Sequence, residues 1–200
     1  VEYSPGIGGL LDYRTYLADY RTYLRFGLDQ TLALRITGGM SQGRNANHFL
    51  LGGVDNWMNR AFSRRFPADR IEDIYLSTWL TPLRGAEFYE RTGRWACLTN
   101  IEIRFPLIRY FVLGWPLPLG FRNIRGAIFS DVGGAWEQMG NFRLSRVVDG
   151  DRRLDDLVWG YGAGVRLDVA FFLLRFDVAW KNDLSSNSRP KYYVSFGADF

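Results

Sequence analysis

Alternation of apolar and polar residues with a period of two is the feature that most constrains the fold of this chain, and it is clearest in residues 157–182. The odd positions Trp159, Tyr161 and Val165 are apolar, whereas the even positions between them carry glycine or charge. After a phase change near Phe171, the even positions become apolar and the odd ones mostly polar. A helix would repeat its apolar positions every three or four residues. The stretch therefore predicts two strands, each with one apolar and one polar face.

The same alternation recurs along the chain and predicts eight strands. They cover residues 13–27, 30–40, 47–54, 94–106, 122–136, 157–169, 172–182 and 191–200. Strand segments of about ten residues with an apolar outer face are typical of transmembrane β-barrels. No run approaches the roughly 18 consecutive apolar residues of a helical membrane span. We therefore expect an all-β fold, an antiparallel transmembrane β-barrel, in one outer-membrane domain that covers residues 1–200.

The expected connections alternate in length, as they do in outer-membrane barrels. We expect three long polar connections on the outside of the cell, at residues 55–93, 137–156 and 183–190. Two other connections are short, at residues 41–46 and 170–171. An exception is the segment LIRYFVLGWPLPLG, an apolar turn at residues 107–120 that we expect to lie against the membrane surface.

The start of the chain repeats the sequence DYRTYL at a spacing of seven residues, in residues 12–17 and 19–24. An odd spacing puts the two copies on opposite faces of a strand. Only the second copy can then keep its charges on the inner face, so we expect the first copy to lie beyond the bilayer.

Charges on the sixth and seventh predicted strands indicate how these two strands pair. Placing Asp168 opposite Arg175 also places Arg166 opposite Asp177, so that both cross-strand pairs join unlike charges. A shift by two residues would instead place Arg166 opposite Arg175, which joins like charges. We therefore expect the first register.

Composition excludes several classes of function. A single histidine, His48, and a single cysteine, Cys97, exclude an intrachain disulfide and a His/Cys metal site. The net charge of +4 comes from arginine, since Lys181 and Lys191 are the only lysines. No basic cluster or RNA-binding motif accompanies this charge in the sequence. We therefore expect no nucleic-acid partner, no metal and no other cofactor.

Ser41 lies in GMSQG, which matches the G-x-S-x-G pattern of hydrolases. That pattern forms a nucleophile only where a strand precedes it and a helix follows it. Here polar residues and another strand follow, and His48 is the one possible base. The pattern is better explained as a glycine-rich turn, and an outer-membrane barrel hydrolase using Ser41 and His48 is kept as an alternative.

Three glycines, Gly160, Gly162 and Gly164, lie on the inner face of the sixth predicted strand. They are not a dinucleotide-binding motif, because no helix follows. They leave space for another segment to lie against the wall. The candidate is the arginine-rich loop at residues 55–93, because loops of this length are usually functional or disordered.

Arg84 in this loop has two possible counter-charges, Glu102 and Asp131, which face inward on consecutive strands. Inward carboxylates are costly unless a positive group reaches them. Arg104 and Arg125, on the same two strands, offer an alternative source of compensation. Spacing alone leaves both interpretations open.

Several motifs then occur in a specific order: Gly52–Gly53, Leu83-Arg84-Gly85, TNIEIRFP, AIFSDVGGAW and VSFGADF. In this order the chain resembles the C-terminal half of the barrel of the outer-membrane assembly-factor superfamily, which includes BamA, TamA and the bacterial surface antigens. The resemblance covers residues 20–200. The wording LGGVDNW further resembles members whose barrel follows a TolB-like propeller.

The resemblance implies roles for individual residues. Leu83, Arg84 and Gly85 would form the functional loop motif, with Arg84 folded back into the lumen toward Glu102 and Asp131. A C-terminal assembly signal would comprise Phe196, Gly197 and Phe200. Ala86 departs from the family, which usually has an aromatic residue there, so we expect the loop tip to be weakly anchored.

The resemblance also implies a function. Such barrels are not enzymes and lie in the Gram-negative outer membrane, where they assist the insertion or translocation of other outer-membrane proteins. A weak first/last strand seam would pair with an incoming strand. The implied partners are membrane lipids, lipopolysaccharide, client proteins, and periplasmic domains or chaperones. A passive pore or a passenger-anchoring barrel is the alternative. Because family barrels usually have sixteen strands, we favour half of a larger barrel over a complete small one.

Overall fold

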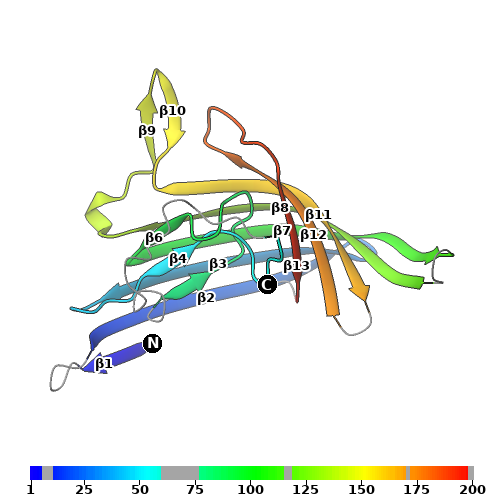
Figure 1. Cartoon of the computed structure of the whole chain (residues 1–200), viewed down its shortest axis with the longest axis horizontal. Coiled ribbons are helices and arrows are strands. Elements are labelled where there is room, and N and C mark those ends of the chain that lie inside the picture. Colours follow the sequence, from blue (N-terminus) through cyan, green and yellow to red (C-terminus); the bar gives the residue numbers. More distant parts are fainter. Residues whose placement is uncertain (6–10, 60–76, 115–118, 170–171, 198–200) are drawn as a thin grey trace.

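The computed structural model describes residues 1–5, 11–59, 77–114, 119–169 and 172–197, and its main element is one antiparallel sheet of eight strands (Figure 1). The strands follow one another in the sheet, in the order β1 (Glu2–Pro5), β2 (Asp12–Phe26), β3 (Gln30–Gln42), β7 (Trp95–Leu113), β8 (Leu119–Trp136), β11 (Leu157–Val169), β12 (Phe172–Asn182) and β13 (Lys191–Phe196). The expected all-β antiparallel fold is confirmed. The sheet is not closed, because β1 and β13 form its two opposite edges.

The remaining elements are small. A two-stranded hairpin and a short 3-10 helix stand in the connection between β8 and β11: β9 (Ser145–Val148), β10 (Asp151–Leu154) and η2 (Met139–Asn141). Among the described residues, no helix has the length and apolar character needed to cross a bilayer. The hairpin β9–β10 rises from the end of the sheet that also holds the β12–β13 connection (Figure 1).

The predicted strand at residues 47–54 is not part of the main sheet, which corrects the expected strand list. Its ordered core, β4 (Phe49–Leu51), pairs with β5 (Thr78–Leu80) and β6 (Arg91–Gly93) in a separate three-stranded sheet. All three residues of β4 are buried, so this strand lies inside the molecule and has no lipid-facing side. The eighth strand of the main sheet is instead β1, whose four residues are too few to show a period.

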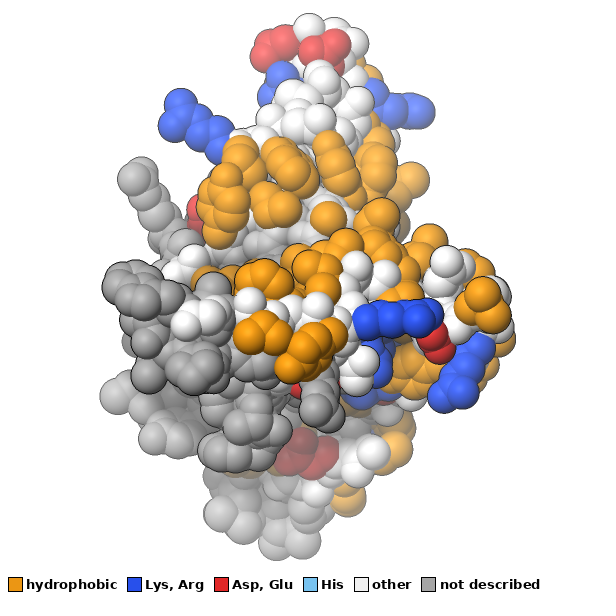
Figure 2. Space-filling view, turned by 90° about the vertical axis from the view of Figure 1, so that its right-hand side faces the viewer, with side chains coloured by type: hydrophobic (Ala, Val, Ile, Leu, Met, Phe, Trp, Pro, Cys, Tyr) orange, Lys and Arg blue, Asp and Glu red, His pale blue; other side chains and the backbone are white. Residues whose placement is uncertain are grey.

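One face of the main sheet is apolar and exposed, as the alternation predicts. Large apolar side chains at alternate positions of five strands are exposed there, for example Tyr20, Ile36, Ile101, Ile128 and Phe176. Figure 2, seen from the right-hand side of Figure 1, shows hydrophobic side chains gathered in the middle and upper part of the view, with charged side chains mainly toward the top and the right. Such a surface is what a lipid-facing wall requires.

The opposite face of the sheet, called the inner face below, is covered by the connection between β3 and β7. Two buried apolar clusters fill the space between this connection and the wall. One joins Phe49, Leu80 and Leu83 to the wall residues Leu98 and Val158. Burial of these side chains therefore holds the connection on the inner face of the sheet.

The register of β11 and β12 differs from the one that the charges predicted. Arg166 lies opposite Arg175, and Asp177 lies opposite Gly164. The reason is the length of the turn: Val169 pairs with Phe172, whereas the predicted register would leave no residue for a turn at all. Unlike charges still meet, because Asp177 reaches diagonally across Gly164 and accepts a hydrogen bond from Arg166.

The apolar segment at residues 107–120 is also corrected. It is largely a continuation of β7 and β8, which pair as far as Leu113 and Leu119 and extend beyond their neighbours as a ribbon (Figure 1). Pro106 pairs with Arg125 and Ile108 with Ile124, so Leu107 is an extra residue in a β-bulge. Its expected contact with the membrane surface stays a prediction.

Both copies of the DYRTYL repeat lie in β2, and they use opposite faces as predicted. In the first copy Tyr13 and Thr15 are buried, while Arg14 points outward. In the second copy Asp19 points to the inner face, where it accepts hydrogen bonds from Arg35. The position of the first copy relative to a bilayer stays a prediction.

Candidate functional site

The site is built on the loop between β5 and β6, whose tip carries Leu83, Arg84 and Gly85. Leu83 forms a two-way backbone bridge with Gly53, with N···O distances of 2.8 and 3.1 Å. Gly52 and Gly53 both have positive φ, and a Cβ on Gly52 would lie 2.2 Å from the Glu87 carbonyl oxygen. The glycine pair therefore lets this strand end lie directly against the loop.

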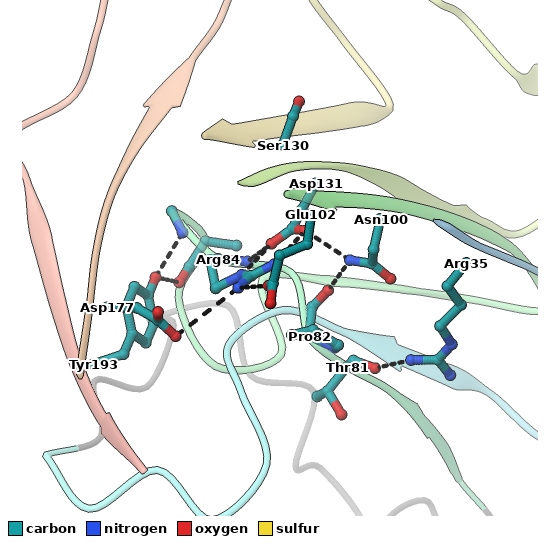
Figure 3. Close-up of polar contacts among 12 residues, drawn as sticks. Arg35, Thr81, Pro82, Arg84, Asn100, Glu102, Ser130, Asp131, Asp177 and Tyr193 are labelled. Carbon is teal, nitrogen blue, oxygen red and sulfur yellow. Dashed lines mark hydrogen bonds and ion pairs between the residues drawn. The ribbon is translucent and has the colours of Figure 1, made fainter. Parts of the chain in front are cut away.

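Arg84 is the centre of a buried ion cluster on the inner face (Figure 3). Its Nε and Nη2 atoms donate to the two carboxylate oxygens of Asp131, at 2.7 and 2.9 Å. Its Nη1 atom donates to Glu102 Oε2 at 2.7 Å and lies 3.9 Å from Asp177 Oδ2. The three acids stand on β8, β7 and β12, so one guanidinium from the loop contacts three strands of the wall. The bidentate geometry to Asp131 is the strongest form of such a pair.

Further arginines complete the charge balance of this cluster. Glu102 also accepts from Arg104 at 2.8 Å and from Arg166 at 3.3 Å, and Arg166 donates to Asp177. The sequence left open whether the loop arginine Arg84 or the wall arginines compensate the buried acids. In the structure, Arg84 and the wall arginine Arg104 both do so. No ion pair joins Arg125 to Asp131 in the part of the chain that the structure describes.

The protonation of Arg84 is fixed by its neighbours. Burial alone would lower the pKa of Arg84, but the carboxylates of Asp131 and Glu102 outweigh it and raise the pKa above its ordinary value. The guanidinium also stacks on the ring of Phe129, with 3.4 Å from its central carbon to the ring centroid. Arg84 is therefore a permanent charge, suited to holding a loop in place and unsuited to proton transfer.

One of the three inner-face glycines admits the loop. A Cβ on Gly160 would lie 1.6 Å from the Arg84 carbonyl oxygen, so only glycine lets the loop backbone approach so closely. The other two serve the wall itself: a Cβ on Gly162 would meet the Val178 carbonyl, and one on Gly164 would meet Asp177. The space predicted for the loop is therefore confirmed at Gly160. At Gly162 and Gly164, the missing side chain instead leaves room for neighbouring atoms of the wall.

The loop tip is anchored through its backbone, which corrects the expectation based on Ala86. The Gly85 N–H donates to the Tyr193 hydroxyl at 2.8 Å, and that hydroxyl donates to the Ala86 carbonyl at 2.8 Å. Ala86 is fully buried. A tyrosine on β13 therefore holds the tip that an aromatic residue at position 86 would otherwise anchor.

The rest of the loop is held by two residues, Asn100 and Arg35, that the sequence did not assign to the site. Asn100 donates to the Pro82 carbonyl at 2.7 Å and to Asp131 at 2.8 Å. Arg35 is buried and donates to the Thr81 carbonyl (Figure 3), and it also donates to Asp19. The period-two pattern predicts that both side chains point to the inner face. It does not predict which loop atoms they contact.

The last turn of the loop carries a second, shallower ion pair. Glu90 accepts from Lys181 Nζ at 2.6 Å and from the Glu87 N–H at 2.8 Å. Burial would raise the pKa of Glu90, but the Lys181 ammonium and the Glu87 N–H outweigh it and lower the pKa below its ordinary value of 4.5. This carboxylate therefore fastens the loop at neutral pH.

Ser41 and His48 do not form a catalytic pair. The Ser41 hydroxyl shares a hydrogen bond of 2.8 Å with the Thr15 hydroxyl and accepts one of 2.8 Å from the Asn47 N–H. His48 Nε2 instead lies 3.4 Å from a carboxylate oxygen of Glu137. Among the described residues there is also no group of three or more His, Cys, Asp or Glu side chains that could hold a metal ion.

The C-terminal residues of the expected assembly signal are placed in part. The Phe196 carbonyl accepts from Asn56 Nδ2 at 3.1 Å, and the Gly197 N–H donates to the Leu173 carbonyl at 3.0 Å. Phe200 lies outside the described residues. The role of these residues in recognition stays a prediction.

Comparison with known proteins agrees with this architecture. The family model of the Omp85 superfamily domain matches residues 1–200, which is the entire sequence. No curated protein matches the chain. Omp85 proteins are outer-membrane β-barrels that act in membrane-protein insertion and translocation and are not enzymes. The resemblance inferred from the motifs is confirmed, and the chain belongs to the Omp85 superfamily.

Proposed function

We propose that this chain is the C-terminal half of a BamA/TamA-like barrel of the Gram-negative outer membrane, and that it assists insertion or translocation of other outer-membrane proteins. The mechanism is pairing of an incoming strand with the edge of β13. One observation carries the proposal: among the described residues, no strand of the sheet pairs with the outer edge of β13, which is covered by the short segment at residues 56–59.

The segment 56–59 engages the edge of β13 through both its backbone and its side chains. Trp57 forms an isolated antiparallel bridge with Ser195, and the Met58 N–H donates to the Val194 carbonyl at 2.8 Å. Asn59 accepts from the Val194 N–H at 3.1 Å and donates to the Tyr192 carbonyl at 2.8 Å. Asn56 donates to the Phe196 carbonyl, as described above. Two asparagine amides thus stand in for the backbone of a missing strand.

An incoming strand can replace the hydrogen bonds of Asn56, Met58 and Asn59, each of which contributes about 0.5–1.5 kcal/mol net, because it offers equivalent partners. Trp57, in the same segment, is buried against Tyr193 and Phe88, so the exchange also costs the packing of this ring. The ion pairs of Arg84 lie on β7, β8 and β12, whereas segment 56–59 contacts β13. The exchange leaves these ion pairs in place, while Tyr193 links the loop tip to the edge strand that a client would meet.

The partners follow from the two faces of the sheet. The apolar exposed face suits membrane lipids, and arginines at the strand ends suit lipopolysaccharide phosphates. The edge of β13 suits client outer-membrane proteins, which periplasmic domains or chaperones would deliver. No cofactor or nucleotide is needed, because the reaction exchanges hydrogen bonds only.

The proposal is tested by removing one edge donor, the Val194 N–H, with Val194→Pro. Proline is tolerated on an edge strand but cannot donate to an added one. The full-length protein is reconstituted in liposomes, and insertion of a urea-unfolded outer-membrane barrel is followed by protease protection. We expect the proline variant to insert at least tenfold more slowly than the wild type.

Val194→Ala is the matched control, because it loses the same side chain and keeps the N–H. Equal insertion rates for the two variants would overturn edge pairing. If neither variant nor wild type accelerates insertion and all conduct ions equally, the passive pore or passenger anchor is the correct function. A hydrolase is not favoured, because Ser41 and His48 are bonded to other residues.

A further inference from the structure

A second group of arginines lines a recess at the end of the sheet where the β2–β3 turn lies. The recess has a volume of about 600 Å³. Four arginines contribute to its lining, and Asp29 is the one acidic residue among them. We call this recess the arginine pocket, defined by Arg25, Arg104, Arg109 and Arg125.

The pocket continues the inner face of the sheet. Residues directly opposite each other on paired strands point to the same face. Arg25 lies opposite Thr31, which lies opposite Arg104. Arg104 is two residues from Glu102 and therefore shares the face of the Arg84 cluster. The pocket thus opens on the face away from the apolar, lipid-suited surface.

The charge of the pocket is not neutralised by the protein. Arg104 bonds Glu102, but no carboxylate lies within ion-pair distance of Arg25, Arg109 or Arg125 in the described part of the chain. Arg125 stands directly opposite Arg166, whose own charge is already paired with Glu102 and Asp177. These two carboxylates therefore do not neutralise Arg125, whose charge remains for an anionic ligand.

Two irregularities of the backbone lie at the pocket, and one of them directs a side chain into it. The extra residue Leu107 in the β-bulge lies between Pro106 and Ile108, which both line the pocket. Asn123, on the facing strand, has φ of 54° and also lines the pocket. Bulges turn side chains toward new directions and are common beside binding sites. Here the bulge brings Arg109 to the same recess as Arg125.

We propose that the arginine pocket binds an acidic segment of a polypeptide. Arginine forks bind carboxylates in a bidentate manner, as Arg84 does with Asp131 in the same molecule. The remaining lining suits a peptide, because it combines amide and hydroxyl groups with apolar side chains: Gln30, Thr31, Asn123, Phe105, Pro106 and Ile108. A volume of this size falls within the about 300–1,000 Å³ of ligand pockets.

A peptide fits the position of the pocket better than a lipid does. Lipid headgroups attach to chains that lie on the apolar face, and the pocket opens on the other face. Under the proposed orientation this end of the sheet faces the periplasm, where client chains and periplasmic partners arrive. The inference deepens the proposed function by adding a partner class, and binding alone tests it, independently of insertion.

The test measures binding of a fluorescein-labelled peptide of eight glutamates to the full chain in neutral detergent micelles, by fluorescence anisotropy at low salt. A peptide of eight glutamines is the uncharged probe. We expect saturable binding of the glutamate peptide that weakens with added salt. We also expect the double variant Arg25→Gln/Arg125→Gln to raise Kd at least tenfold.

The matched control removes two charges elsewhere, with Arg44→Gln/Arg152→Gln. Both residues are exposed and lie outside the pocket. An unchanged Kd in this control supports the pocket, and an equal loss in both double variants would overturn it as general charge attraction. Equal binding of the glutamine peptide would also overturn it. If inorganic phosphate or phosphatidylglycerol micelles displace the peptide more strongly than free glutamate peptide does, the pocket is a phosphate site and the proposal is wrong.

Discussion

Two groups of arginines share the inner face of one sheet, and they differ in what surrounds them. Around Arg84, three carboxylates on three strands are buried with the guanidinium, and every charge has a partner. In the arginine pocket, Arg25, Arg109 and Arg125 have no carboxylate partner in the described part of the chain. The first group holds the protein together, whereas the second keeps its binding capacity for another molecule.

Removing Arg84 should have the largest effect on stability. Arg84→Ala leaves Asp131 and Glu102 buried with much of their compensation gone, and breaking a buried pair costs about 3–5 kcal/mol. We expect a decrease of that size in the free energy of unfolding, measured by guanidinium titration of the refolded chain with tryptophan fluorescence. Arg84→Lys, which keeps the charge and loses the bidentate contact, should recover part of it. Unchanged stability and unchanged conductance would instead favour the passive pore.

Acid should weaken the attachment of the loop at its rim, through Glu90. The pKa of Glu90 is lowered in the folded protein, so its ion pair stabilises the fold above the unfolded value of 4.5 and is lost as the pH falls below it. We expect the wild type to lose about 1 kcal/mol in this window. Unfolding titrations at a series of pH values measure it, and Glu90→Gln should flatten the profile. A variant curve that still follows the wild-type curve would rule Glu90 out.

Removing Arg125 should have the smallest effect on stability. Its side chain is exposed and its direct neighbour is the like-charged Arg166. We expect Arg125→Gln to change the free energy of unfolding by no more than about 0.5 kcal/mol, in the same guanidinium titration. A loss as large as that of Arg84→Ala would show that both arginine groups are structural, and the contrast between them would disappear.

The sequence predicts the wall of this protein better than it predicts the loop. Period-two alternation identifies the strands and the face of each side chain, including Glu102 and Asp131, because alternation is a local property. The path of the β3–β7 connection is not local: Gly160, Tyr193 and Asn100 meet it from strands far along the chain. The register of β11 and β12 shows the same limit, because turn length overruled the charge pairing at Asp168 and Arg175.

The sequence predicts only the centre of the site. The strand pattern and the family resemblance indicate Arg84, Glu102 and Asp131, whereas they do not indicate that Asp177 and Tyr193 also meet the loop. The arginine pocket was not visible at all, because its four arginines are spread over residues 25–125 and form a cluster only after the strands pair. A search for basic runs in the sequence therefore finds nothing.

The contacts of Arg84 have a consequence for the shape of the wall. Its carboxylate partners stand on β7, β8 and β12, and Tyr193 on β13 bonds the adjacent loop residues. A single short peptide therefore cross-links two strands in the middle of the sheet to two strands at its β13 edge. These strands are joined on the inner face by the loop as well as through their backbone ladders, so the loop acts as a brace across this half of the wall.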